Sequence, residues 1–249
     1  MTYLIIGASS GLGKDLVYEF ASKGNNLIIS SRDIRDLKNL KKDIELKYKV
    51  KVKILRIDLA NLDDVKKKIN LNNKFFDGIT GVLFPAGQMD DADFINLRPL
   101  LVGDLIFSNF ISITYIISSY YQKKEKGIIV GFGSVSALFG RRTNPYYTAS
   151  KRALESYFES LISNNNKKNI NIQFYILGYL DTNLSFGKKL FLPRGSTKNL
   201  SKLVYKKRLL KNCKIYFPIW WSIIGFIINI IPFKILILIF NFFKKNEKN

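Results

Sequence analysis

The most telling stretch of the chain is Thr2-Tyr-Leu-Ile-Ile-Gly7-Ala-Ser-Ser-Gly11-Leu-Gly13. Its apolar first half predicts a buried strand, and its glycines fall at the turn that opens the next helix. Glycines at such a turn let the backbone approach a pyrophosphate closely, and the amino end of a helix favours the negative charge. The pattern therefore indicates a dinucleotide-binding loop. Its expected cofactor contacts are Gly7, Ser9, Ser10, Gly11, Leu12 and Gly13.

Beyond that turn, strand-length apolar runs alternate with helical patterns through most of the chain. This alternation predicts an α/β fold, a single Rossmann-type doubly wound parallel sheet. Strands are expected at 2–6, 26–31, 51–57, 79–84, 127–132, 170–176 and 213–217. Helices are expected at 11–23, 33–47, 61–71, 94–122 and 147–164. Residues 1–217 would form one cofactor-binding domain, in which 179–211, rich in Gly and Lys and without clear periodicity, would be a mobile substrate lid.

The composition excludes several kinds of active site. The 249 residues include no histidine and a single cysteine, Cys213. Ser-His-Asp hydrolysis, Cys-His catalysis, histidine-bound zinc, multi-cysteine metal sites and internal disulfides are therefore excluded, and no metal is expected. Proton transfer must fall to Tyr, Lys or carboxylates. The chain runs from Met1 straight into a strand pattern without a basic leader, so we expect no signal peptide and a cytoplasmic location.

The run Pro145-Tyr-Tyr-Thr-Ala-Ser-Lys151 places a phenol and an ammonium four residues apart. On a helix, Tyr147 and Lys151 would share one face. A free phenol ionises near pH ~10, and a neighbouring cation lowers that pKa towards the range of a general acid or base. The spacing alone is also compatible with a helix start that carries an ordinary surface lysine.

The residues after the second and third strands bear on which cofactor binds. Dinucleotide folds usually place an acid after the second strand, but here the position reads Ser30-Ser31-Arg32. An arginine suits a 2′-phosphate, which favours NADP(H) over NAD(H); a solvated arginine is the alternative. Asp58, followed by Leu59, is a candidate acceptor for the adenine amino group. A helix-capping role is the alternative for Asp58, although Asn61 is better placed to cap.

The C-terminal part of the chain is both basic and apolar. The net charge is +21, and residues 182–249 contain fourteen Lys/Arg and one acid. Beside so apolar a stretch, this charge indicates an anionic membrane surface and not nucleic acid. Pro232 and Lys234 divide residues 215–243 into pieces too short to span a bilayer, since a spanning helix needs ~20 apolar residues.

We therefore expect residues 218–249 to be a membrane-associating tail of two interfacial helices, with Trp220 and Trp221 at headgroup depth. The protein would then be attached peripherally to the inner face of a membrane. A single tilted span over 219–243 is one alternative, and a buried C-terminal helix or subunit contact is another.

Several of these features occur in order and at characteristic intervals. They are the glycine turn, Ala86-Gly87, Asn109 in the long helix before the fifth strand, Ser134, and Tyr147-x-x-x-Lys151. Over roughly residues 1–182 the chain thereby resembles the short-chain dehydrogenase/reductase family. Two positions depart from the family pattern. Phe84-Pro85-Ala86-Gly87 stands where Asn-Ala-Gly is usual, and Leu177-Gly178 where Pro-Gly is usual.

The resemblance implies an NAD(P)-dependent oxidoreductase that acts on CH–OH groups. Tyr147 would protonate the carbonyl oxygen, and Lys151 would lower the Tyr147 pKa and hold the nicotinamide ribose. Ser134 would hydrogen-bond the substrate oxygen, and Asn109 would position water that links Lys151 to solvent. The implied contacts at the nicotinamide end are Ala86, Gly87, Tyr147, Lys151, Gly178 and Thr182.

The tail is similar to that of the family branch that reduces keto-sugars on polyprenyl phosphates, like the decaprenylphosphoryl-ribose 2-keto reductase. The resemblance thus implies NADPH-dependent reduction of a lipid-linked keto-sugar, with Arg141 and Arg142 near a lipid phosphate; a solvated turn is the alternative for both arginines. Reduction of a 3-keto lipid, such as a 3-oxoacyl or sphingoid ketone, is the alternative. A non-catalytic dinucleotide-binding scaffold is an alternative of another class. Family members usually form homodimers or homotetramers through the helices before and after the fifth strand.

Overall fold

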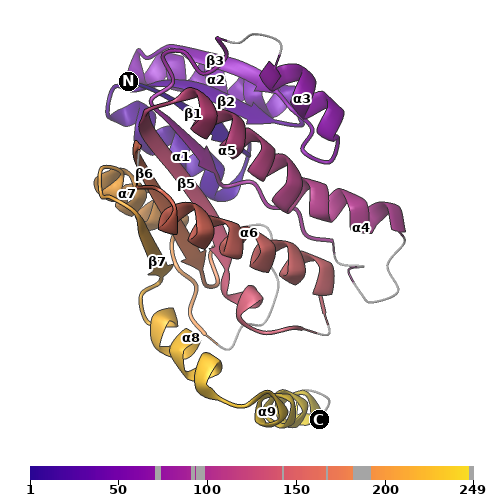
Figure 1. The fold of residues 1–249 in the computed structure, drawn as a ribbon. Coiled ribbons are helices and arrows are strands. Elements are labelled where there is room, and N and C mark those ends of the chain that lie inside the picture. The colour runs from indigo at the N-terminus through magenta and orange to yellow at the C-terminus, as the bar shows by residue number, and fades with distance from the viewer. Residues whose placement is uncertain are drawn as a thin grey trace.

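A computed structural model describes residues 1–70, 74–90, 93, 99–141, 143–166, 168–181 and 192–246. Its centre is a seven-stranded sheet in the order β3-β2-β1-β4-β5-β6-β7, with every neighbouring pair parallel (Figure 1). The order reverses between β1 and β4, which confirms the predicted doubly wound α/β fold. The strands are β1 (Thr2–Ile6), β2 (Asn26–Ser31), β3 (Val52–Arg56), β4 (Gly81–Phe84), β5 (Lys126–Ser134), β6 (Asn169–Leu177) and β7 (Cys213–Phe217).

Helices cover both faces of the sheet, as crossover connections between parallel strands require. On one face lie α1 (Gly11–Ser22), α2 (Ile34–Tyr48) and α7 (Thr197–Lys207). On the other lie α3 (Leu62–Asn70), α5 (Ser112–Lys123) and α6 (Pro145–Ser163). The remaining helical elements are α4 (Pro99–Ile106), η1 (Phe107–Ile111), η2 (Val135–Leu138), α8 (Trp221–Ile230) and α9 (Phe233–Asn246).

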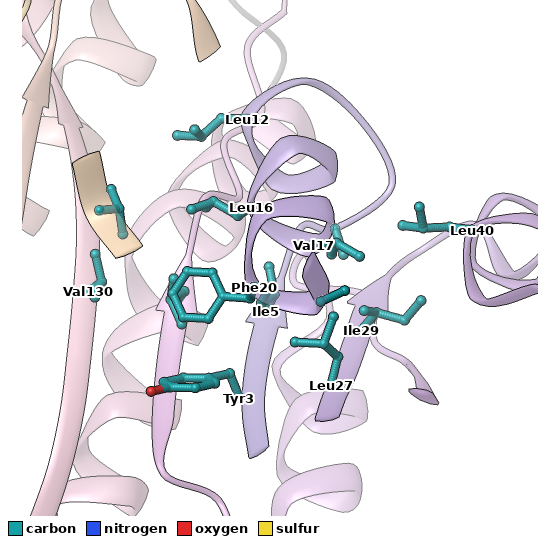
Figure 2. Packing of buried hydrophobic residues seen from close by; sticks show 14 of the residues in the cluster. Tyr3, Ile5, Leu12, Leu16, Val17, Phe20, Leu27, Ile29, Leu40 and Val130 are labelled. Carbon is teal, nitrogen blue, oxygen red and sulfur yellow. The ribbon is translucent and has the colours of Figure 1, made fainter. Parts of the chain in front are cut away.

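Alternation along the strands builds the two halves of the core. In β1, Tyr3 and Ile5 face α1 and α2, whereas Leu4 and Ile6 face the opposite layer. Figure 2 shows the first half, where Tyr3 packs beneath Phe20 of α1 with ring centroids 4.7 Å apart. Each such buried side chain contributes about 1.5–3 kcal/mol relative to exposure. This packing fixes α1, and with it the glycine turn, above the end of β1.

The helix expected at 94–122 is observed from Pro99 to Lys123, with a π-helical turn, η1, in its middle; residues 94–98 lie outside the described chain. Within the described ranges this is the one helix long and apolar enough to cross a membrane. Ile113, Ile116 and Ile117 are nevertheless fully buried against the sheet. The helix therefore belongs to the core, and its π-helical turn carries Asn109.

The prediction of a lid over 179–211 is wrong for its C-terminal half, which forms α7. Ser196 caps this helix, and Leu200 and Val204, one turn apart, are fully buried against α1. Tyr205 adds an edge-to-face contact with Phe20 at 5.0 Å. The apolar positions of this short helix were hidden by the lysines between them. Residues 182–191 of the proposed lid lie outside the described chain.

The tail folds into two helices, α8 and α9, which divide at Ile231-Pro232. The predicted division of the tail into two helices is confirmed, and a single helix over 219–243 is not observed. The placement of the two helices in a membrane interface stays a prediction. In Figure 1 both helices (yellow) lie at the end of the molecule remote from β1–β3. Trp221 was expected at headgroup depth but is only 6% exposed, because its ring packs between Tyr179, at 5.6 Å, and Trp220, at 4.8 Å.

Candidate active site

One continuous cleft of about 830 Å³ follows the carboxyl ends of the strands. Loops after β1, β2, β3, β4, β5 and β6 all contribute to its walls, as expected at the switch point of a doubly wound sheet. Most of the predicted site residues line it: Gly7, Ser9, Ser10, Gly11, Leu12, Arg32, Asp58, Leu59, Ala86, Gly87, Ser134, Tyr147, Lys151 and Gly178. Gly13 and Asn109 lie behind the wall, and Thr182 lies outside the described residues.

The glycine turn forms a tight cradle at one end of the cleft. Gly7 has a φ of +93°, and a Cβ added to it would lie 2.7 Å from the Cα of Ala86. A Cβ on Gly13 would lie 1.8 Å from the carbonyl oxygen of Gly7. Ser10 precedes α1, and its side chain makes no hydrogen bond to the start of this helix. The backbone N–H groups of the first turn of α1 therefore stay available to an anion. These residues fit the pyrophosphate of a dinucleotide.

The neighbouring part of the cleft carries the residues predicted to choose the cofactor. Arg32 is exposed at the end of β2, and in the described part of the chain no carboxylate lies within ion-pair distance of it. Asp58 accepts a hydrogen bond from the backbone of Ala60 (3.1 Å), while Asn61 caps α3 as predicted. The Ser112 hydroxyl donates to the carbonyl of Leu59 at 2.7 Å and so fixes this loop on α5.

Ser134 and Tyr147 meet near the centre of the cleft. The Ser134 oxygen accepts hydrogen bonds from the hydroxyl and the backbone of Ser136, at 2.8 and 3.2 Å. Because its oxygen already accepts twice, its own proton is left to donate. Burial raises the pKa of Tyr147 above 10.0, while the Ser134 hydrogen bond and the charge of Arg141 act in the opposite direction. Tyr147 therefore keeps its proton at neutral pH.

Lys151 lies beneath the phenol, with its Nζ 5.9 Å from the centroid of the Tyr147 ring. The ammonium donates to the carbonyls of Ala86 and Phe132, both at 3.3 Å. The side chain is only 3% exposed, and this burial lowers the pKa of Lys151 to about 8. The prediction that a cation lowers the Tyr147 pKa is wrong in its net direction, because burial of the phenol outweighs the favourable contacts.

Asn109 is fully buried in η1 and holds the loop that follows β4. Its side-chain oxygen accepts from the backbone N–H of Gln88, and its amide donates to the Gln88 carbonyl, both at 2.7 Å. The amide is thus engaged with the main chain and does not point into the cleft. Its predicted part in positioning water beside Lys151 stays a prediction.

Two side chains that the sequence did not single out hold the central residues in place. Asp93 is fully buried, and its carboxylate accepts from the backbone N–H groups of Tyr146 (3.1 Å) and Tyr147 (2.9 Å). It therefore ties the loop after β4 to the first turn of α6. Ser136 orients Ser134, as described above. The spacing Ser134-x-Ser136 was a readable local signal, whereas nothing near Asp93 in the sequence indicated its partner 54 residues away.

The glycine cradle, the lysine below the tyrosine and the serine beside it can be compared with known proteins. The family model of the short chain dehydrogenases matches residues 1–189. The chain belongs to the short-chain dehydrogenase family. Its members are NAD(P)-dependent dehydrogenases and reductases acting on CH–OH groups.

Two curated relatives are similar over most of the chain. A very-long-chain 3-oxoacyl-CoA reductase of Vanderwaltozyma polyspora is 31% identical over 197 residues, which cover 72% of this chain and 55% of the relative. A hydroxysteroid 11-beta-dehydrogenase 1-like protein A of Xenopus laevis is 26% identical over 238 residues, covering 87% and 77%. The chain thus spans only about half the length of the first relative.

A solved structure is similar in fold. The short-chain dehydrogenase from Sphingobium yanoikuyae in complex with NADPH superimposes with a TM-score of 0.78 at 21% identity, covering 93% of this chain and 96% of that one. This likeness extends beyond the 189 residues of the family match into the C-terminal part of the chain.

Proposed function

We propose that the protein uses NADPH to reduce a ketone carried on a long-chain membrane lipid. The observation that carries this proposal is the cleft itself. It joins a phosphate cradle to Ser134, Tyr147 and Lys151 and then continues into an apolar end lined by Phe139, Leu192 and residues of α8. Such an end suits a hydrocarbon chain next to the reacting carbonyl.

Each central residue has a role that its surroundings support. Tyr147, which keeps its proton at neutral pH, would donate it to the carbonyl oxygen. Ser134 would donate its proton to the same oxygen and stabilise the developing charge. Lys151 would provide positive charge beneath the phenol and a donor for the ribose. A bound nicotinamide would supply the hydride. Asn109 would keep the Gln88 loop in place around them.

The preference for NADPH rests on Arg32. Its guanidinium is exposed beside the cleft, and the position is one at which an acid would hold the 2′-hydroxyl of NAD(H). A free guanidinium suits a 2′-phosphate. NADP(H) is therefore the cofactor we propose, with NAD(H) binding more weakly.

For the substrate, a 3-oxoacyl lipid is the first candidate. The similarity to a 3-oxoacyl-CoA reductase supports it, as does the apolar end of the cleft. A keto-sugar on a polyprenyl phosphate is the second candidate. Arg141 favours it, because this exposed cation lines the cleft close enough to Tyr147 to act on its pKa and is available to a phosphate. Arg142 lies outside the described residues.

We further propose that α8 and α9 attach the protein to the cytoplasmic face of a membrane. Their exposed side chains are strongly apolar; Phe226, Phe233 and Leu238 are 66%, 65% and 68% exposed. Soluble monomers rarely leave such contiguous apolar surface in water. Lys234 is exposed in α9, and the sequence beyond Phe243 adds three further lysines against one acid. This combination suits anionic lipid.

The experiment is NADPH oxidation by the full chain with three ketones presented in anionic vesicles. They are a long-chain 3-oxoacyl-CoA, a polyprenyl-phosphate keto-sugar and a short water-soluble ketone. Turnover of the first supports the primary candidate, and turnover of the second alone supports the keto-sugar. Tight NADPH binding without turnover of any ketone would overturn the enzymatic proposal in favour of a dinucleotide-binding scaffold.

A homodimer or homotetramer remains part of the proposal. The helices on which family members pair flank β5, and Leu100 at the start of α4 is 85% exposed. Light scattering of the purified protein in detergent measures the assembly, and a mass equal to one chain of 28.7 kDa would contradict it.

A further inference from the structure

Helix α8 is apolar on both of its faces, yet only one of them touches the protein. The inward row consists of Trp221, Ile224, Gly225 and Ile228, at the i, i+3, i+4, i+7 spacing of one helical face. The outward row consists of Ile223, Phe226, Ile227 and Ile230, with exposures of 64%, 66%, 49% and 63%. Ser222 and Asn229 mark the narrow polar stripe between these two rows. Apolar rows on opposite sides of a helix require apolar surroundings on both sides.

The inward row is fixed to the catalytic domain. Trp221 packs so closely on the loop after β6 that a Cβ added to Gly178 would lie 1.8 Å from its Nε1. Gly225 lies against Tyr216 of β7, where an added Cβ would be 3.0 Å from the phenol oxygen. Immediately after α8, Phe233 contacts Phe139 with ring centroids 5.6 Å apart. Helix α8 is therefore a wall of the fold and not a loose appendage.

The inward row also borders the cleft. Trp221, Ile224 and Ile228 line the same continuous cavity as Ser134 and Tyr147. The buried indole N–H of Trp221 has no hydrogen-bond partner among the described residues. One side of a single helix thus lines the reaction cleft, and the other side presents the apolar surface for which we propose a bilayer.

We infer that α8 is a partition between bilayer and active site, and that Ile224 and Ile228 form a subsite for the hydrocarbon chain of the substrate. The inference rests on the proposed function, since it identifies where the chain of a lipid ketone lies. The carbonyl then reaches Tyr147 while its chain remains in apolar surroundings from the membrane to the cleft.

The test measures chain binding without turnover. Trp220 and Trp221 are the only tryptophans of the chain, so in a Trp220→Phe background the fluorescence reports Trp221 alone. A stearic acid with a nitroxide in mid-chain, kept below its micelle concentration, is expected to quench Trp221, and unlabelled stearic acid should reverse the quenching. Ile228→Phe fills the subsite and should raise the Kd about tenfold, the cost of mild overpacking. The matched control, Ile227→Phe, adds the same ring to the outward row and should leave the Kd unchanged.

Vesicle flotation tests the outward row, whose substitution should affect membrane binding and not fatty-acid binding. Ile227→Asp should lose binding to anionic vesicles and retain the Kd for the labelled fatty acid, whereas Ile228→Phe should still float. Equal effects of the two rows in both assays, or quenching that Ile228→Phe does not alter, would overturn the inference. If labelled chain binds at Trp221 but no ketone is reduced, the subsite stands and the proposed function fails.

Discussion

Replacing Lys151 by methionine should stabilise the fold while it disables the site, and the stabilisation should depend on pH. Burial lowers the pKa of Lys151 from 10.5 to about 8, a difference of about 2.5 pH units. At ~1.36 kcal/mol per unit, the buried ammonium costs about 3 kcal/mol at pH 7. Its two 3.3 Å hydrogen bonds to backbone carbonyls offset part of this cost, about 1 kcal/mol each. The expected net gain for Lys151→Met at pH 7 is therefore about 1 kcal/mol.

The sign of the pH dependence follows from proton binding. Between pH 8 and 10.5 the folded chain binds fewer protons at Lys151 than the unfolded chain does, so the wild type gains stability as the pH rises. At pH 10 the cost of the ammonium has fallen to about 1 kcal/mol. The unfolding free energy of Lys151→Met relative to wild type should thus fall by about 2–3 kcal/mol between pH 7 and pH 10, from an advantage of about 1 kcal/mol to a deficit of about 1–2 kcal/mol.

Urea denaturation of both proteins at the two pH values measures this difference. Lys198→Met, at an exposed position of α7, is the matched control. Its difference from wild type in unfolding free energy should be the same at pH 7 and pH 10. If the difference in unfolding free energy between Lys151→Met and wild type is the same at pH 7 and pH 10, burial of the ammonium does not destabilise the fold as the structure indicates.

Three further predictions concern the cradle, the cofactor and the catalytic helix. Gly13→Ala forces a Cβ against the Gly7 carbonyl. It should weaken NADPH binding, measured by fluorescence, and lower the free energy of unfolding by about 1–3 kcal/mol; an unaltered Kd and Tm would contradict this. Arg32→Ser should raise the Kd of NADPH by about 10- to 100-fold and leave that of NADH unchanged, and a parallel rise in both would refute the 2′-phosphate assignment. Asp93→Ala should lower kcat with little change in the NADPH Kd, and Asp93→Asn, which keeps one acceptor for the Tyr147 N–H, should recover part of the loss; equal loss in both variants would exclude a positioning role.

Periodicity predicted most of the fold, because burial on both faces of a parallel sheet leaves a strong record in the sequence. The seven strands, the helices that connect the first six of them and the glycine turn could all be predicted, as could the pairing of Tyr147 with Lys151 on one helix. These features are local, in that each is encoded by neighbouring residues. The family resemblance covers the same features.

The rest could not be predicted because it depends on residues far apart in the chain. Asp93 meets the start of α6 only in the folded protein, and Trp221 reaches Gly178 only once the tail has folded back. Helix α7 was missed because lysines mask its apolar face. The direction of the Tyr147 pKa was missed for a related reason: the spacing of Tyr147 and Lys151 gives their proximity but not the depth of their burial.

The proposed reduction depends most on Tyr147 as the proton donor for a carbonyl. The measurement that tests it is the kcat of Tyr147→Phe for NADPH-dependent reduction of a long-chain 3-oxoacyl substrate, together with the NADPH Kd by fluorescence titration. We expect kcat to fall by about 10²–10⁴-fold, the rate enhancement that a general acid usually contributes, and the Kd to stay unchanged. A variant that binds NADPH normally and keeps more than about a tenth of the wild-type kcat would contradict the account.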